Sequence, residues 1–299
     1  MSNLLIVGDG AIGLLFSHFL STQHNLTVLT RHNTSHDRFY NDNITHEKIN
    51  ATFVNLNQLS LLPKFDMVLF TVKAFQVQSA FSQVKPFLSA QCSIVLSHNG
   101  MGNVEELKNE ITQYQALYFL TTSMAAFKLN QYSVLHKGHG QSIIGGCNDL
   151  ALKNTTNTLE LLNAIPHLTS SNNIQRLRFE KLLVNIAINP LTALHNIKNG
   201  ELRAPKYSSM IFNLLTEACH IANAQNLNIT LIDALENAYK VMTNTAQNYS
   251  SMHQDVINNR ATEIMAICGY IRQQGELFNI KTPYNDDVFT KIEAKKSVV

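Results

Sequence analysis

The stretch that most constrains the fold of this chain runs from Asn3 to Gly13, with the sequence Asn-Leu-Leu-Ile-Val-Gly-Asp-Gly-Ala-Ile-Gly. Its apolar part, residues 4–7, is typical of a parallel strand that is buried on both faces. Gly8, Gly10 and Gly13 then follow with the Gly-x-Gly-x-x-Gly spacing. We expect a tight turn at Gly8, close backbone approach to a pyrophosphate at Gly10, and close helix packing at Gly13.

The helix expected after these glycines supports a nucleotide site. It should begin near Ala11, so that the first-turn N–H groups, including that of Ile12, and the positive dipole end would hold phosphates. Residues 14–20 continue with a broad apolar face. This context favours a dinucleotide site over the alternative, an ordinary glycine turn between strand and helix. Asp9 fits less well, because its carboxylate would repel a pyrophosphate unless the side chain points away.

The end of the second expected strand indicates which dinucleotide is bound. An acidic residue about 20 positions beyond the glycines usually binds the ribose 2′-hydroxyl of NAD, whereas an arginine nearby accommodates the 2′-phosphate of NADP. Thr30, Arg31 and His32 stand at this place and include no carboxylate. The sequence therefore favours NADP(H) over NAD(H). The alternative is that Arg31 is a solvated surface residue.

Two domains are expected from the length of 299 residues and from a change of pattern along the chain. Residues 1–171 alternate strands and helices and predict a Rossmann-type α/β domain that binds NADP. Residues 172–299 have helical periodicity and predict an all-α substrate and catalytic domain. The ligand crevice of such a protein is expected between the two domains.

Composition and charge exclude several classes of protein. The formal charge is only +2 and there is no long basic block, so we expect neither nucleic acid nor an acidic membrane as partner. The four cysteines are widely scattered and the histidines have no metal-ligand spacing, so we expect reduced thiols and no metal site. No apolar run reaches the roughly 18 residues that span a bilayer. We therefore expect a cytoplasmic protein.

The segment 176–189 carries the most informative polar pattern. Lys181, Asn185 and Asn189 follow at four-residue steps and form a narrow stripe on a helix whose other faces are largely apolar. A buried amide without a partner costs about 1–3 kcal/mol, so such a stripe favours a ligand site. The alternative is coincidence, because 33 of the 299 residues are asparagine.

A second group of polar residues lies nearer the C-terminus and has ordinary explanations as well. Ser250 or Ser251 could cap a helix, and Glu263 could be a solvated charge paired with Arg260.

Taken together, these residues resemble the ketopantoate reductases over residues 3 to about 290. The segments that carry the resemblance are Gly8–Gly13, Thr71–Gln76, His98–Gly102, Asn185–Thr192, Asn199–Leu202, Ser250–Met252 and Thr262–Glu263. The resemblance implies NADPH-dependent reduction of 2-dehydropantoate to (R)-pantoate in pantothenate and coenzyme A synthesis. The chain departs from the family pattern at Asp9 and at residues 120–124, which affects the expected cofactor rim more than the chemistry.

The resemblance also implies roles for single residues. It makes Lys181 the general acid and Glu263 the active-site carboxylate, which also contacts the cofactor. The implied substrate-binding residues are Asn99, Asn185, Asn189, Asn199 and Ser251. The implied cofactor contacts are Gly8, Asp9, Gly10, Ala11, Ile12, Gly13, Arg31, Lys73, Asn99 and Ala126.

Two other functions remain open at this point. One is an NADPH-dependent reductase that acts on another branched 2-keto acid, because the polar anchors do not fix the alkyl part of the substrate. The other is a non-catalytic NADP-sensing protein, which would have no need of a proton donor. The expected partners are a small keto acid and a second copy of the chain in a homodimer.

Overall fold

The computed structural model describes residues 2–31 and 35–296, so His32 lies outside the described residues. By its contacts the chain divides into two compact units. Unit 1 comprises residues 1–98 and 103–174, and unit 2 comprises residues 99–102 and 175–299. The short segment 99–102 therefore belongs to unit 2, although unit 1 flanks it in sequence. The boundary expected between residues 171 and 172 stays a prediction.

Unit 1 is built on an eight-stranded sheet with the order β12-β11-β8-β7-β6-β1-β2-β5. Strands β8, β7, β6, β1, β2 and β5 are parallel, β11 is antiparallel to β8, and β12 is parallel to β11. The carboxyl ends of the six parallel strands thus share one edge of the sheet. The bounds are β1 (Asn3–Val7), β2 (Asn25–Leu29), β5 (Thr52–Val54), β6 (Phe65–Phe70), β7 (Leu88–Leu96), β8 (Ala116–Thr122), β11 (Ser142–Gly146) and β12 (Leu168–Ser170).

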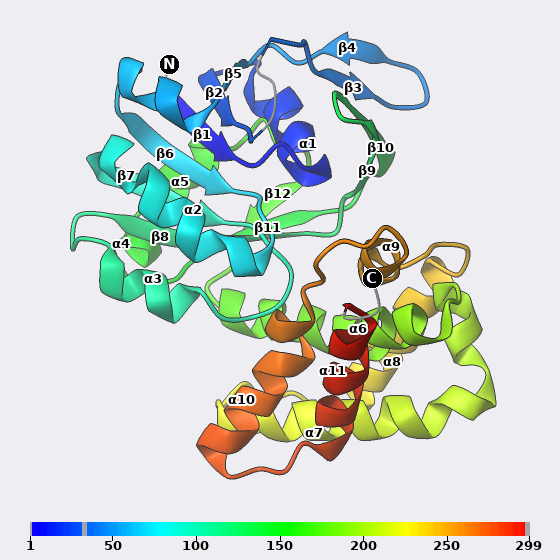
Figure 1. Ribbon diagram of the computed structural model, residues 1–299. Helices are drawn as coiled ribbons and strands as arrows, with labels where there is room; N and C mark the ends of the chain where they lie inside the picture. The colour runs from blue at the N-terminus through cyan, green and yellow to red at the C-terminus, as the bar shows by residue number, and fades with distance from the viewer. Residues whose placement is uncertain (1, 32–34, 297–299) are drawn as a thin grey trace. The chain divides into compact units, whose positions relative to one another are not determined.

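Both faces of this sheet are buried, which explains the unbroken apolar runs of its strands. In β1, Leu4 and Ile6 point into one core cluster, and Leu5 and Val7 point into another on the opposite face. Helix α1 (Ala11–Leu20) contributes to the first cluster, and α2 (Val77–Val84) and α3 (Val104–Glu110) contribute to the second. Figure 1 shows α2 and α3 together on the near side of the sheet. Two short helices, α4 (Asp149–Lys153) and α5 (Thr155–Leu161), complete unit 1.

A second sheet, with four strands, belongs to unit 1. Its order is β4-β3-β10-β9, with bounds β3 (Phe39–Asn41), β4 (His46–Lys48), β9 (Ala125–Asn130) and β10 (Ser133–Gly138). Strands β10 and β11 follow each other along the chain, but they belong to different sheets. β10 pairs with β3 and β9, whereas β11 pairs with β8 and β12.

Unit 2 is helical and has its own hydrophobic core, so the predicted order of a Rossmann-type α/β region and an all-α region is confirmed. Helices α7, α10 and α11 contact one another, and α8 packs on α7. The bounds are α6 (Ile174–His195), α7 (Ser208–Ala224), α8 (Leu231–Asn244), α9 (Ser251–Ile257), α10 (Cys268–Phe278) and α11 (Pro283–Lys296). Short 3-10 helices are η1 (Leu56–Leu61), η2 (Ala74–Gln76), η3 (Lys85–Phe87), η4 (Asn199–Arg203), η5 (Pro205–Tyr207) and η6 (Ile264–Ala266).

Helix α6 contains Pro190 and continues through it to His195. Proline removes one main-chain hydrogen-bond donor from a helix and crowds the preceding turn. Residues 191–195 still lie in the apolar core through Leu191 and Ala193, and this burial holds the last turns in place. Among residues 2–31 and 35–296, no helix combines the length and the hydrophobicity needed to cross a membrane.

Candidate functional site

The glycine loop joins β1 to α1 in unit 1, and two of its three glycines, Gly8 and Gly13, are required for steric reasons. Gly8 has a φ of 108°, and a Cβ there would lie 2.9 Å from Cγ1 of Val72. A Cβ on Gly13 would lie 2.0 Å from the carbonyl oxygen of Gly8, so the close packing of α1 on the loop requires glycine. At Gly10, in contrast, a Cβ would meet nothing within 4 Å. Of these three loop glycines, Gly10 alone faces open space.

This open space lies at the N-terminus of α1. Gly10 is the N-cap residue and provides no side chain to cap the first turn, and Ala11 and Ile12 are partly buried. The first N–H groups of a helix have no partner within the helix, and the helix dipole makes this end attractive to anions. An uncapped helix end beside an open cradle fits the pyrophosphate of a dinucleotide. The residues present therefore suit the cofactor that the sequence implies.

The Asp9 carboxylate is turned toward the end of β2. Its Oδ2 accepts a hydrogen bond from Oγ1 of Thr30 at 2.8 Å and lies 4.0 Å from Nη2 of Arg38. Lys128 donates to the main-chain carbonyl of Asp9 at 3.0 Å. A pyrophosphate would be repelled by a carboxylate that points at it, and these contacts hold the side chain toward Thr30 and Arg38.

Of the other expected cofactor residues, Asn99 and Glu263 belong to unit 2, whereas Arg31, Lys73 and Ala126 lie in different parts of unit 1. Arg31 is exposed directly after Thr30, and Lys73 follows β6 and precedes η2. Because β6, β1 and β2 are parallel neighbours, both residues share the sheet edge with the glycine loop. Ala126 lies in β9 of the other sheet, paired with His136. The cofactor roles of these residues stay predictions.

The polar stripe on α6 forms as expected. Lys181, Asn185 and Asn189 follow one another at four-residue steps of the helix, and only 7% of the Asn189 surface is exposed. Lys181 and Asn185 are partly buried. Nδ2 of Asn185 is buried and makes no hydrogen bond to any residue that the structure describes. A buried donor of this kind is costly, and a ligand oxygen would satisfy it.

Burial sets the charge properties of Lys181. Desolvation lowers the pKa of its ammonium group below the ordinary value, and the Glu263 carboxylate partly opposes that shift. Oε2 of Glu263 also accepts a hydrogen bond from Nδ2 of Asn99 at 3.0 Å. Glu263 is 9% exposed, and Arg260 pairs with Asp255 at 3.2 Å. The alternative of a solvated Glu263 paired with Arg260 is therefore wrong.

The adjacent residues Ser250 and Ser251 have different environments. Ser250 is buried and is the N-cap of α9, where its Oγ accepts from the main-chain N–H of His253 at 3.1 Å. Its hydroxyl also lies 2.7 Å from that of Thr192 on α6. Ser251, the expected substrate residue, is exposed in the first turn of α9. The substrate role of Ser251 stays a prediction.

Asn199 lies in η4 and is only 7% exposed. Its Nδ2 donates to Oγ1 of Thr245 at 2.9 Å, and its main-chain N–H donates to the carbonyl of Asn248 at 3.0 Å. Its Oδ1, however, is buried without a hydrogen bond from any of the described residues. Asn185 offers a buried donor and Asn199 offers a buried acceptor. A carboxylate oxygen of a ligand would accept from the first group, and a ligand hydroxyl would donate to the second.

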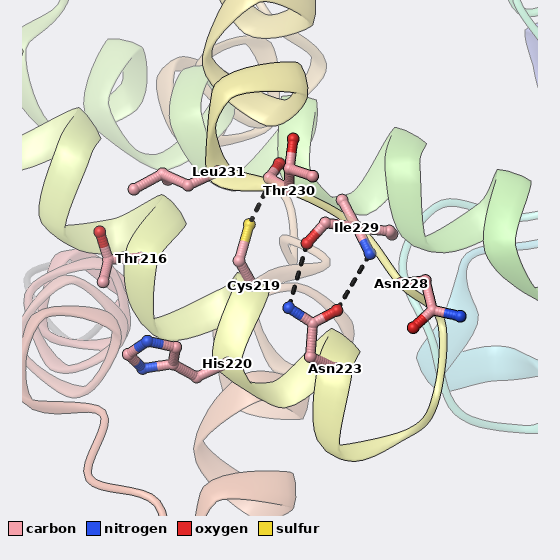
Figure 2. Close-up of a pocket in the computed structure, with 8 residues that line it drawn as sticks. All are labelled: Thr216, Cys219, His220, Asn223, Asn228, Ile229, Thr230 and Leu231. Atoms are coloured by element: carbon pink, nitrogen blue, oxygen red, sulfur yellow. Dashed lines mark hydrogen bonds between the residues drawn. The ribbon is translucent and has the colours of Figure 1, made fainter.

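The pocket of Figure 2 lies on α7 and the loop that leads into α8, and the expected site residues do not line it. Cys219 lines this pocket. Burial raises the pKa of its thiol to about 11, so the thiol is protonated at neutral pH. Asn223 already uses its amide twice, because it donates to the carbonyl of Ile229 and accepts from the N–H of the same residue. The Cys219 thiol is therefore not an activated nucleophile.

Sequence reasoning missed two polar groups beside the expected sites. Arg38 is completely buried near Asp9, and Thr192 joins α6 to the cap of α9. Arg38 lies in the weakly patterned segment 32–64, where no periodic signal identified it. Thr192 belongs to the segment Asn185–Thr192, which carries part of the family resemblance. Its partner Ser250 lies 58 residues away, and no local pattern connects the two residues.

Comparisons with known proteins agree over nearly the whole chain. A family model described as Ketopantoate reductase PanE/ApbA matches residues 4–149, and one described as Ketopantoate reductase PanE/ApbA C terminal matches residues 173–296. A 2-dehydropantoate 2-reductase of Vibrio cholerae is 35% identical over 292 residues, which is 97% of this chain and 97% of that protein.

Solved structures show the same fold. A probable 2-dehydropantoate 2-reductase from Bacillus subtilis superposes with a TM-score of 0.82 at 29% identity and covers 98% of this chain and 99% of its own. A D-mandelate dehydrogenase, solved with NADH and anilino(oxo)acetate, has a TM-score of 0.92 at 20% identity and covers 99% of this chain and 98% of its own. At that identity the second likeness concerns the fold alone.

Proposed function

Because this chain belongs to the ketopantoate reductase family, we propose that it reduces 2-dehydropantoate to (R)-pantoate with NADPH, a step of pantothenate and coenzyme A synthesis. One observation carries the proposal. Lys181 lies partly buried on α6 with Glu263 acting on its charge, in line with the two amides Asn185 and Asn189. A sensor of NADP would not need such a proton donor, so this arrangement favours the enzyme.

The residues act by charge and orientation. NADPH supplies the hydride when it is bound, and the glycine loop with Arg31 and Lys73 holds it. Reduction of a ketone leaves negative charge on the oxygen, so a nearby ammonium group stabilises that charge. Lys181 then donates its proton to the ketone oxygen, which is general acid catalysis typically worth about 10² to 10⁴-fold.

The remaining polar groups bind and orient. Asn185, Asn189, Asn199 and Ser251 bind the hydroxyl and carboxylate oxygens of the keto acid with neutral donors and acceptors. Glu263 favours the protonated form of Lys181, because the carboxylate opposes the fall in pKa that burial causes. Asn99, which donates to Glu263, holds that carboxylate in place.

The proposal also covers the oligomeric state and the cellular location of the protein. We expect a cytoplasmic homodimer, and a ketopantoate reductase of Staphylococcus aureus with the same fold is described as dimeric. Light scattering of the purified protein would give twice the mass of the chain if a homodimer forms, and the mass of one chain if it does not.

The test is an assay of NADPH oxidation by the purified protein, followed at the nicotinamide absorbance band. 2-Dehydropantoate is compared with other branched 2-keto acids, and NADH replaces NADPH in parallel reactions. We expect the highest kcat/KM with 2-dehydropantoate and NADPH. A higher value with another keto acid would move the proposal to that substrate, and NADPH binding without turnover of any of them would favour a sensor.

A further inference from the structure

A carboxylate stands at the end of β2 after all, although the sequence places none there. In NAD-binding Rossmann folds the acidic residue that binds the ribose 2′-hydroxyl belongs to the end of this strand. Here the group comes from the glycine loop instead, because Oδ2 of Asp9 is 2.8 Å from Oγ1 of Thr30, the residue directly after β2. The side chain of Asp9 is 14% exposed, so a ligand can reach it.

Arg38 lies on the buried side of that carboxylate. Its side chain is 0% exposed, and its Nη2 is 4.0 Å from Oδ2 of Asp9. The guanidinium carbon lies 4.9 Å from the ring centre of Phe53 and 4.7 Å from that of Tyr132. Arginine stays charged even when buried, so these rings fix a permanent positive charge behind Asp9.

The charges around the end of β2 are therefore mixed. Arg31 supplies a positive charge on the exposed side, and Lys128 donates to the main-chain carbonyl of Asp9 at 3.0 Å. A 2′-phosphate at this place would be attracted by the cations and repelled by Asp9. A 2′-hydroxyl would instead find an acceptor in the same carboxylate. The relative affinity for a 2′-phosphate and a 2′-hydroxyl therefore depends on how far Arg38 offsets the charge of Asp9.

We propose that Asp9 and Arg38 form a cofactor-selecting pair. Asp9 is the acceptor for a ribose 2′-hydroxyl, and Arg38 is a positioning residue that offsets the carboxylate charge, so that a 2′-phosphate is accepted as well. With Asp9 and Arg38 present, the enzyme therefore prefers NADPH over NADH by a smaller factor than it would with Arg31 alone. This inference rests on the proposed function, because it requires the adenosine end of the cofactor to lie beside the glycine loop.

Binding of cofactor fragments tests the pair without turnover. Isothermal titration calorimetry would compare adenosine 2′,5′-bisphosphate with adenosine 5′-monophosphate. For Asp9→Asn, in which the amide oxygen can still accept from Thr30, the ratio of the two affinities should rise about three- to tenfold in favour of the bisphosphate. For Arg38→Met the ratio should fall by a similar factor. The double variant should return close to the wild-type ratio.

A matched charge change in α3 provides the control. Glu106→Gln makes the same charge change at an exposed position of α3 and should leave the ratio unchanged. Asp9→Asn decides the proposal even if Arg38→Met does not fold, because it leaves Arg38 in place. A ratio that falls or stays constant in Asp9→Asn would overturn the pair. A wild-type protein that fails to bind the bisphosphate would instead contradict the proposed cofactor site.

The same pair should be visible in steady-state kinetics of the whole enzyme. Asp9→Asn should raise the ratio of kcat/KM with NADPH to kcat/KM with NADH, mainly through a higher KM for NADH. Loss of activity with both cofactors in equal proportion would indicate a structural role for Asp9 and would contradict selection.

Discussion

Lys181 is the residue at which stability and activity oppose each other. Burial lowers the pKa of its ammonium group, so the charged form is less favourable in the folded protein than in the unfolded chain. At any pH below the folded-state pKa the group is charged in both states, and its desolvation then costs stability. A functional reason for keeping it there is the proton that it donates.

We predict that Lys181→Met lowers kcat by about 10² to 10⁴-fold and leaves the free energy of unfolding at pH 7 unchanged or higher. Methionine fills the space of the lysine stem and needs no hydration. Steady-state kinetics and urea unfolding measure the two quantities. Lys240→Met at an exposed position of α8 is the matched control and should keep full activity. Wild-type turnover of Lys181→Met would rule out the proton-donor role.

The pH dependence of activity follows from the same residue. Activity requires the protonated ammonium and is lost as pH rises through the pKa of Lys181. Glu263 raises that pKa. We therefore predict that Glu263→Gln moves the alkaline limb of the kcat/KM profile to lower pH. Glu236→Gln, exposed on α8, should leave the limb in place. An alkaline limb that is the same in Glu263→Gln and wild type would show that Lys181 does not control it.

Among the secondary-structure elements, the turn from β1 to α1 contains one glycine that packing requires, Gly13, and one that leaves space for a ligand, Gly10. Gly13 and Gly10 differ by what a methyl group would meet. At Gly13 it would meet the carbonyl oxygen of Gly8 at 2.0 Å, whereas at Gly10 it would meet nothing within 4 Å. The φ of Gly10 is −67°, which alanine adopts easily.

We predict that Gly13→Ala destabilises the protein by about 1–3 kcal/mol, as overpacking does. Gly10→Ala should keep the stability within about 0.5 kcal/mol. It should nevertheless raise the KM for NADPH about tenfold, because the methyl group occupies the space that the pyrophosphate approaches. Thermal unfolding and NADPH titration distinguish the two variants. If Gly10→Ala bound NADPH as tightly as wild type, the open cradle would not be the phosphate site.

At the scale of the whole molecule, unit 1 and unit 2 have separate hydrophobic cores. A ligand that binds only the native protein stabilises it, by about 2.7 kcal/mol at 100 times the Kd. We predict that NADPH slows hydrogen exchange first at residues 8–13 of unit 1. Mass-spectrometric hydrogen exchange with and without NADPH, with adenosine as a control, measures this. Protection confined to other parts of the chain would place the cofactor elsewhere.

Features that depend on neighbours along the chain could be predicted from short segments. The glycine spacing after an apolar run gave the turn from β1 to α1, and a lysine with two asparagines at four-residue steps gave the stripe on α6. Both patterns follow from the periods of strand and helix, which any short segment reveals. Family motifs extended this reading to Asn99 and Glu263, whose roles local pattern alone did not determine.

Contacts between residues that are distant in sequence could not be predicted in this way, because they depend on how the chain folds. Asn99 and Glu263 are 164 residues apart, yet they share a hydrogen bond within unit 2. The absence of a carboxylate after β2 was true of the sequence, but Asp9 brings one to Thr30 through the parallel pairing of β1 and β2. Buried polar groups must find partners wherever the chain passes. Those partners depend on topology, which no short segment of sequence contains.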